Sequence, residues 1–512
     1  MGRIIFNEDP NHFIYSRAKA GCKKITKEDL VDFIKQYEGT DVTDFMICVG
    51  ASIPWYRSKR LKDIITQYKE WVRDGKDKLY MGGETELIFS CINLLTEYEE
   101  AYGEVFYDTW IPTLREIGIR PWLSIRMNDI HECTQEDSIL FSDFYRENRE
   151  HNRASHRGAV GYYDYALDYM NENVREHYLT VIEDALEHFD ADGLELDWMR
   201  EIYSITIGRE YEGIAVINAF MREVYAMVKR MEEKRGHKIP IAVRLPDTPE
   251  KALRLGFDVF DWAENGLIEL ITVTPRWSSV DNDMPIDLWK RIFKGKPVEI
   301  AAGLEILIDA YNRRGRKYEY NTLETAVGSA CAILWQGADA TYLFNYMDEI
   351  PTTKGHHDFL TGGRYREFLK TVGDYEACVS ATRRHVVTYN DVSAIGAAGK
   401  KQLPVRLSGD GKPLSYEALR LVTGDIPRSR RVNVVLGIEV DGDFDVSALF
   451  VYLSAKKCDF LEERAPFAQQ YADIRYFVYT LENDGTLPPV SVIEMGLSAG
   501  KATVHWAEIE IL

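Results

Sequence analysis

The sequence predicts an α/β fold, in which a (β/α)8 TIM barrel is followed by a C-terminal antiparallel β domain of the sandwich or jelly-roll type. Through roughly the first 375 residues, short apolar runs alternate with longer amphipathic segments, as in βα units that build a parallel sheet. After about Arg384 the pattern changes to alternating strands separated by turn residues. With 512 residues, 45% of them hydrophobic, the chain is long enough for two domains, which we place at 1–380 and 381–512.

Eight apolar runs supply the strands of the predicted barrel, and the segments between them have helical periodicity. The strands are predicted at residues 12–17, 44–50, 120–128, 193–198, 239–246, 268–275, 298–305 and 338–346. Residues 25–38 and 174–189 are two of the amphipathic helices between them. The connection from Met127 to about Asn171 is long enough to form a lid or a subsite wall at the carboxyl end of the third strand, and surface decoration is the alternative.

The overall charge argues against two classes of partner. The formal charge of -20, from 82 acidic and 62 basic side chains, repels phosphate backbones and anionic membrane surfaces, so we expect neither nucleic acid nor a membrane as a partner. Seven cysteines without paired short spacings are typical of a reducing compartment. The first residues, MGRIIFNEDPNHF, lack the apolar run of a signal peptide, so we expect a cytoplasmic protein, although a chain trimmed of its leader would look the same.

The fourth predicted strand, in the segment DGLELDW, places two carboxylates on one face. Because side chains alternate along a strand, Glu195 and Asp197 face the barrel axis, while Leu194 and Leu196 meet the helices. Asp197 lies nearest the mouth of the barrel and Glu195 one layer below. Two carboxyl groups buried side by side have pKa values that are driven apart, as acid and base catalysis requires. The alternative for Glu195 is a structural acid held by a neighbouring arginine.

The same alternation places further polar side chains inside the barrel, near the strand ends. They are Ser124, Arg126 and Asn128 on the third strand, Arg244 on the fifth, Thr272, Thr274 and Arg276 on the sixth, and Glu299 and Glu305 on the seventh. A barrel interior held by packing alone favours branched apolar residues, so this polarity indicates a site. The arginines either neutralise the carboxylates or grip a carboxylate or sulfate group of a substrate.

Glycosidic cleavage requires two carboxyl groups across the scissile bond. Glu195 and Asp197 stand on the same wall, so the better partner of Asp197 is Glu305, which lies nearly opposite in an eight-stranded barrel. We therefore predict Asp197 and Glu305 as the main catalytic pair, with Glu195 tuning or replacing one of them. Rival second carboxylates are Asp247, Asp281 and Asp283.

Residues at the strand ends are predicted to bind the substrate, because flat aromatic faces stack on sugars and polar groups orient them. Four aromatics, Trp55, Trp198, Trp277 and Tyr346, fall near the predicted mouth, and packing of loops onto the barrel is the alternative for them. The full predicted binding set is Trp55, Arg126, Asn128, Trp198, Arg200, Arg244, Asp247, Arg276, Trp277, Asn345 and Tyr346.

Motifs of other chemistries are missing from the sequence. No GxxxxGKS/T, HExxH or GxSxG motif occurs, and His131, His356 and His357 lack metal-ligand partners at useful spacing. We therefore expect neither a cofactor nor a metal.

The segment 167–200, LDYMNENVREHYLTVIEDALEHFDADGLELDWMR, resembles the fourth βα unit of the glycosyl-hydrolase-like family-ten barrels. The matching positions are Asn171, Val174, Arg175, Asp192, Gly193, Asp197 and Trp198, and the TPRW of residues 274–277 is loosely similar to the end of that group's sixth strand. The resemblance implies a TIM barrel that acts on glycans, with Asp197 among its functional residues. The chain departs from the family at Glu195, where those proteins carry a less acidic residue, and in its C-terminal β domain.

Together these observations predict a glycoside hydrolase for an oligosaccharide or glycoside. One alternative is a metal-dependent sugar isomerase, epimerase or lyase with Glu195, Asp197 and Glu305 as oxygen ligands. The other is a non-catalytic glycan-binding protein. The C-terminal domain is predicted to be a carbohydrate-binding module, or a packing appendage that completes the site or the dimer interface of a homo-oligomer. Trp506 lies in a regular alternating strand and is predicted to be core, which favours the packing role.

Overall fold

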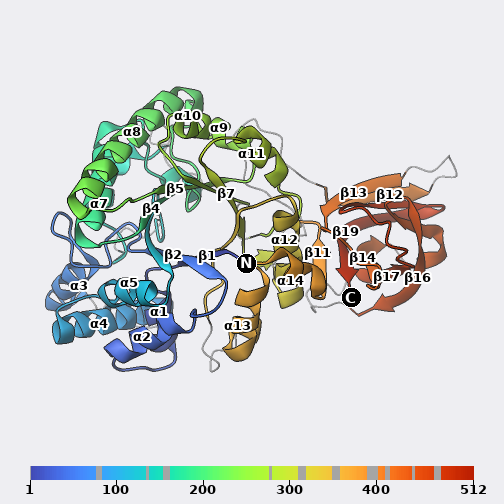
Figure 1. Cartoon of the computed structure of the whole chain (residues 1–512), viewed down its shortest axis with the longest axis horizontal. Coiled ribbons are helices and arrows are strands. Elements are labelled where there is room, and N and C mark those ends of the chain that lie inside the picture. Colours follow the sequence, from blue (N-terminus) through green and yellow to red (C-terminus); the bar gives the residue numbers. More distant parts are fainter. Residues whose placement is uncertain are drawn as a thin grey trace.

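In the computed structural model, the first part of the chain forms a closed eight-stranded parallel barrel, as predicted (Figure 1). The structure describes residues 2–76, 83–133, 138–153, 162–275, 279–308, 319–348, 358–388, 402–409, 416–440, 444–465 and 474–512. The barrel strands are β1 (Ile4–Glu8), β2 (Val42–Cys48), β3 (Arg120–Arg126), β4 (Gly193–Asp197), β5 (Ile241–Pro246), β6 (Leu270–Thr274), β7 (Glu299–Leu304) and β10 (Ala340–Leu343). They pair in chain order, and β10 closes the ring on β1.

The predicted first strand, residues 12–17, is wrong. These residues lie in helix α1 (His12–Lys19), and the chain enters the barrel earlier, through β1. The apolar side chains of Phe13 and Ile14 are buried on one side of this helix, and basic residues occupy its last turn, where they interact favourably with the helix dipole. Pro10 follows β1 and prevents its continuation, since proline has no backbone N–H to pair.

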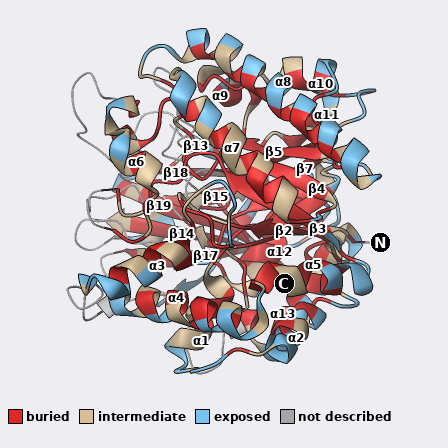
Figure 2. Ribbon diagram, turned by 90° about the vertical axis from the view of Figure 1, so that its left-hand side faces the viewer, coloured by how far each residue is buried: buried red, intermediate tan, exposed pale blue. Residues whose placement is uncertain are grey.

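Helices surround the barrel, with buried inner faces and exposed outer faces (Figure 2). After α1 they are α2 (Lys27–Lys35), α3 (Ile64–Arg73), α4 (Gly83–Tyr102), α5 (Phe106–Glu116), α6 (Asp143–Glu147), α7 (Glu172–His188), α8 (Glu210–Arg235), α9 (Pro249–Arg254), α10 (Val259–Glu264), α11 (Ile286–Ile292), α12 (Leu323–Trp335), α13 (Gly362–Thr371) and α14 (Tyr375–Ser380). None of the helices within the described residues has both the length and the apolarity of a membrane span.

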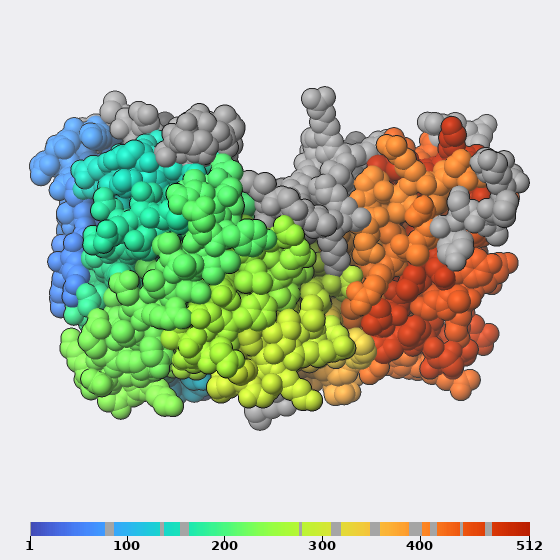
Figure 3. All heavy atoms as spheres, turned by 90° about the horizontal axis from the view of Figure 1, so that it is seen from above, coloured from blue at the N-terminus to red at the C-terminus, as the bar shows by residue number. Residues whose placement is uncertain are grey.

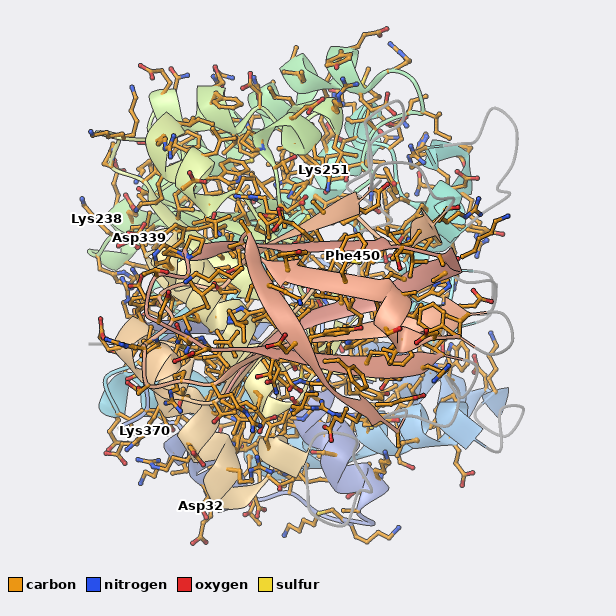
Figure 4. The ribbon with its side chains drawn as sticks, turned by 90° about the vertical axis from the view of Figure 1, so that its right-hand side faces the viewer. Asp32, Lys238, Lys251, Asp339, Lys370 and Phe450 are labelled. Atoms are coloured by element: carbon orange, nitrogen blue, oxygen red, sulfur yellow. The ribbon has the colours of Figure 1, made fainter. Side chains whose placement is uncertain are left out.

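Inward side chains divide the barrel into an apolar and a polar region. The apolar cluster contains Ile5, Met46, Trp122, Ala242, Leu270, Ala301, Ala340, Tyr342 and Phe344. Trp122 fills the space over Gly193, its register partner, where a Cβ atom would lie 2.1 Å from the indole ring. Towards the carboxyl ends of the strands the buried inner positions become polar. Lys238 and Asp339, which precede β5 and β10, lie at the opposite end of the barrel (Figure 4).

The second part of the chain is a nearly closed antiparallel sheet of nine strands, which confirms the predicted β domain. Its strands are β11 (Arg383–Val386), β12 (Val405–Gly409), β13 (Tyr416–Val422), β14 (Val432–Val440), β15 (Leu449–Leu453), β16 (Lys456–Arg464), β17 (Arg475–Leu481), β18 (Val490–Leu497) and β19 (Gly500–Ile511). The order is β11-β19-β14-β17-β16-β15-β18-β13, and β12 pairs with β19. Because β12 also contacts β13 and β18, the two ends of this order approach each other.

The two parts lie side by side and share a core (Figure 3). The main apolar cluster of the barrel continues into Val386, Val435, Tyr476 and Trp506 of the C-terminal sheet. Trp506 is 1% exposed, so its predicted place in the core is confirmed. Helix α12 packs against β11 at Gly328, where a Cβ atom would lie 2.0 Å from the main-chain oxygen of Arg384.

Candidate active site

The inner face of β4 carries Glu195 and Asp197, as the alternation predicts. Strand register sets Glu195 beside Ser124, and Asp197 between Arg126 on β3 and Arg244 on β5. Glu195 is fully buried and Asp197 is 1% exposed. Carboxylates so deeply buried are stable only where hydrogen bonds or cations compensate for lost hydration.

Arg244 lies between the two carboxylates that the sequence pairs across the barrel. Its Nη1 donates to Oδ2 of Asp197 at 3.2 Å, and its Nη2 donates to Oε1 of Glu305 at 3.0 Å. The guanidinium also lies over the ring of Phe344, 3.8 Å from the centroid. Burial lowers the pKa of Arg244, but the carboxylates outweigh this effect and raise it above its ordinary value. Arg244 is therefore a permanent cation. It neutralises Asp197 and Glu305, which is one of the two roles predicted for the inward arginines.

Glu195 has a different environment. The hydroxyl of Ser124 at 2.7 Å and the phenol of Tyr342 at 3.0 Å both donate to Oε1, while Oε2 has no hydrogen-bond partner among the described residues. Burial, and then the negative charge of Asp197, raise the pKa of Glu195 to about 7, against the lowering by its hydrogen bonds and by Arg244. Glu195 thus holds a proton in slightly acidic solution.

The hydrogen bonds of Asp197 all come from N–H donors of the described residues. Its Oδ1 accepts the backbone N–H groups of Met199 at 2.8 Å and Arg200 at 3.1 Å, in the turn that follows β4, and Arg244 donates to both of its oxygens. Hydrogen bonds from N–H donors and a cation stabilise a carboxylate, not a carboxylic acid. The donors around Asp197 therefore suit a carboxylate acceptor, one layer above Glu195.

Glu305 directly follows β7, and its main chain is fixed by two buried side chains. The amide of Asn321 and the phenol of Tyr346 each donate to the carbonyl oxygen of Glu305 at 2.7 Å. Asn321 also donates to the phenol oxygen of Tyr346 at 2.8 Å, which completes a ring of hydrogen bonds. The carboxylate of Glu305 can consequently reach Arg244 from a fixed backbone position.

A second charged cluster lies where β1, β3 and β4 end. Arg126 forms ion pairs with Asp9 and, at 3.0 Å, with Asp129. Arg200 lies 3.8 Å from Asp129 and contacts His131. Burial raises the pKa of the Asp129 carboxyl, but His131, Arg126 and Arg200 outweigh it and lower that pKa well below its usual range. The predicted binding residues Arg126 and Arg200 are thus both engaged with acidic partners.

Three of the four predicted rim aromatics are not on an open rim, and that prediction is wrong for them. Trp55 is 2% exposed, and Trp198 and Tyr346 are fully buried. Trp198 continues the helix-facing side of the β4 alternation, so its ring packs against Tyr169 and Phe257, each with a centroid distance of 5.1 Å. The geometry favours the loop-packing alternative for these aromatics.

Two other predicted binding residues have local partners. The amide of Asn128 donates to the carbonyl of Leu167 at 2.9 Å and accepts its N–H at 3.0 Å, which ties the long loop after β3 to the barrel. Asp247 is 1% exposed and forms an ion pair with Lys251 at 2.8 Å. Both are placed to support the structure around the site.

The remaining predicted residues are scattered. Asn345 follows β10 in a left-handed conformation, with φ of 64°, and is half-buried. Glu299 begins β7 at the far end from Glu305 and pairs with Arg3 at 2.9 Å. Of the rival carboxylates, Asp283 forms an ion pair with Arg420 of the C-terminal sheet. Arg276, Trp277, His356 and His357 lie outside the described residues.

Sequence reasoning missed several residues of this site. Tyr342 and Phe344 face the axis next to Glu195 and Arg244, and the alternation rule applied to the last strand would have found them. Asp9 was hidden by the wrong assignment of the first strand. Asp129 follows β3 and carried no motif.

A cavity of about 180 Å³ lies beside the barrel, not over the carboxylates. It is lined by the loop from Val49 to Pro54, by Phe144 of α6 and by His177 and Val181 of α7. The rings of Phe144 and His177 stack with a centroid distance of 3.9 Å, and burial lowers the pKa of His177 to about 4. This imidazole is neutral at physiological pH.

The chemistry available inside the barrel is that of separated acid and base. One carboxyl group holds a proton near neutrality, and two others surround a fixed guanidinium. The cation between Asp197 and Glu305 is Arg244 itself. Within the described residues, no three His, Cys, Asp or Glu side chains gather as metal ligands.

Comparison with solved structures gives several distant neighbours. No family model and no curated protein sequence matches the chain. The glycoside hydrolase domain of PgaB from Bordetella bronchiseptica aligns with a TM-score of 0.42 and 9% identity, over 73% of this chain and 99% of that chain. The chitinase ChiW from a Paenibacillus species aligns with a TM-score of 0.40 and 11% identity, over 94% of this chain.

A Paenibacillus cycloisomaltooligosaccharide glucanotransferase aligns with a TM-score of 0.33 and 9% identity, over 99% of this chain. The chain spans 39% of the length of ChiW and 57% of the length of the glucanotransferase. Since all three TM-scores are below 0.5, the fold assignment rests on the strand pairing of the barrel itself.

Proposed function

We propose that this protein is a glycoside hydrolase whose chemistry takes place between Asp197 and Glu305. The observation that carries the proposal is the divergence of three carboxyl environments within one barrel. Glu195 has a pKa raised to about 7, while Asp197 and Glu305 both accept hydrogen bonds from Arg244. Glycosidic cleavage requires a carboxyl group that donates a proton and another that is charged; Glu195 offers the first, and the two carboxylates bound to Arg244 offer the second.

The roles follow from position. Asp197 and Glu305 contact Arg244 from different walls of the barrel, and they flank the glycosidic bond in this proposal, with the Arg244 guanidinium beside it. Glu195 lies one layer below Asp197 and is hydrogen-bonded to two hydroxyl groups. When Glu195 is protonated, one negative charge next to Asp197 is removed, and this is how Glu195 tunes the pair in our proposal. The substrate is an oligosaccharide or glycoside, and the segment 167–200 supports a relationship to the family-ten barrels.

A direct test is turnover of a panel of oligosaccharides and aryl glycosides by Asp197→Asn and Glu305→Gln. We expect each variant to lose at least about 100-fold in kcat, the usual contribution of one acid or base group. Asp184→Asn is a matched control, because Asp184 is equally buried but lies on α7 and accepts from Tyr56. Activity like that of the wild type in either test variant would remove that residue from the mechanism.

A glycan-binding protein without catalysis is separated by a second measurement. If the wild type binds a glycan but forms no product after prolonged incubation, its function is glycan binding and not hydrolysis. Loss of turnover on treatment with a chelator would favour the metal-dependent isomerase or lyase instead.

A further inference from the structure

The backbone that follows Glu305 is paired on both sides. Two residues beyond Glu305, the short strand β8 (Leu307–Ile308) pairs with β9 (Glu319–Tyr320). On its other side, the N–H of Val280 donates to the carbonyl of Leu307 at 3.0 Å. The main chain that carries Glu305 therefore depends on residues 279–282, which we name the anchor segment.

The anchor segment is held by the C-terminal sheet, not by the barrel alone. The hydroxyl of Thr388, just after β11, donates to the carbonyl of Val280 at 2.5 Å. The amide of Asn282 donates to the carbonyl of Val386 at 2.9 Å, and the N–H of Val422 on β13 donates to the carbonyl of Asn282 at 3.0 Å. Three hydrogen bonds thus join Val280 and Asn282 to β11, to β13 and to Thr388, just after β11.

The anchor segment itself is buried, whereas Thr388 is half-buried. Val280 and Asn282 are each 2% exposed, and Val386 is fully buried within the apolar cluster that both domains share. Hydrogen bonds that are shielded from water have defined geometry and are costly to leave unmade. The C-terminal sheet consequently fixes the anchor segment in one position.

We infer that Thr388 and Asn282 are positioning residues of the active site, through which the C-terminal sheet sets the location of Glu305. The connection runs from Thr388 to Val280, from Val280 to Leu307, and along two residues of chain to Glu305. The ring of hydrogen bonds from Asn321 and Tyr346 holds the same backbone from the barrel side. The C-terminal domain is then part of the catalytic framework. The effect of this positioning on catalysis rests on the proposed function.

The sharpest test compares Thr388→Val with Thr388→Ser in the full chain. Valine has the shape of threonine but no hydroxyl, whereas serine keeps the donor to Val280. We expect Thr388→Val to lower kcat about 10-fold, with KM changed less than about 2-fold, because misplaced catalytic groups cost chemistry more than binding. Thr388→Ser should keep a kcat close to that of the wild type.

Hydrogen–deuterium exchange supplies a readout that does not depend on any substrate. Peptides that cover residues 302–308 should exchange faster in Thr388→Val and in Asn282→Ala than in the wild type, at unchanged protection of β4. Asn433→Ala is the matched control, because Asn433 is a buried asparagine of β14 that bonds to Glu510 within the C-terminal sheet. It should leave residues 302–308 and kcat unchanged.

The outcomes separate the two proposals. Unchanged exchange at residues 302–308 in both Thr388→Val and Asn282→Ala would overturn the positioning role, whatever the activity. A wild-type kcat in both variants, with Glu305→Gln inactive, would also overturn it. Full activity of Glu305→Gln would instead overturn the proposed function, and the exchange measurement would still decide whether the C-terminal sheet fixes this backbone.

Discussion

At the scale of single residues, burial and the charge of Asp197 raise the pKa of Glu195, although both of its hydrogen-bond donors lower it. Asp197 meets backbone N–H groups and a guanidinium, whereas the hydrogen-bond partners of Glu195 are hydroxyl groups. Hydroxyl groups can accept as well as donate, so they tolerate either form of Glu195. Two neighbouring acids of the same strand thus meet different kinds of hydrogen-bond donor.

Glu195→Gln replaces a carboxyl group that titrates inside the barrel by an amide that does not titrate. Because the pKa of about 7 in the folded state exceeds the ordinary 4.5, the folded state binds this proton more tightly, and the wild type loses stability as the pH rises from 4.5 to 7. The shift corresponds to about 3 kcal/mol in the free energy of unfolding. In urea titrations the variant should match the wild type near pH 4.5 and exceed it by up to that amount at pH 8. Parallel pH profiles of the two proteins would show that the pKa is not raised.

Arg244→Met leaves Asp197 and Glu305 buried without their shared cation. We expect a loss of about 3–5 kcal/mol in the free energy of unfolding, the usual cost of breaking a buried ion pair. Arg254→Met is the control, since Arg254 pairs with the exposed Glu250 and should cost less than about 1 kcal/mol.

The triple variant Asp197→Asn, Arg244→Met, Glu305→Gln distinguishes charge from packing. It removes the uncompensated charges and should recover part of the lost stability. If it recovers nothing, Arg244 acts through packing on Phe344 and not through its charge.

At the scale of elements, seven of the barrel strands are found where the sequence predicts them, because their apolar runs are short and bounded by turn residues. The prediction of the first strand is wrong because Phe13 and Ile14 form a short apolar run, which is also typical of a strand. In the structure they are buried residues of α1. Period-two alternation also placed Glu195 and Asp197 correctly. Continued past the end of β4, the same alternation places Trp198 on the side that faces the helices.

Gly328→Ala tests how closely helix α12 approaches strand β11. A Cβ atom would lie 2.0 Å from the main-chain oxygen of Arg384, and neither backbone can yield without moving its element. We expect a loss of about 1–3 kcal/mol in thermal or urea unfolding, as for overpacked cores. Gly363→Ala in α13 has open space around its Cβ and should leave stability unchanged or slightly raised. Similar effects of the two substitutions would mean that the helix and strand are not in close contact.

At the scale of the whole molecule, the sequence predicts two parts and favours a packing role for the second, but it does not predict which residues join them. The shared cluster joins residues from β11, β14, β17 and β19 to the barrel helices, and no local pattern encodes contacts between segments so far apart. The bridge formed by Arg244 has the same origin, since Asp197, Arg244 and Glu305 come from β4, β5 and the end of β7. Alternation predicts which side of a strand a residue occupies, whereas the partner it meets depends on ring closure.

Ring closure also has a consequence for how this protein is made. β1 can pair with β10 only after residue 343 has been synthesised, and β19, the last strand, separates β11 from β14 in the C-terminal sheet. A nascent chain therefore leaves the ribosome with open strand edges until β19 has been synthesised. Such edges are where chains aggregate and where chaperones bind. We expect the yield of folded protein in cells to depend on the speed of translation and on chaperone supply more than on the stability of the finished molecule.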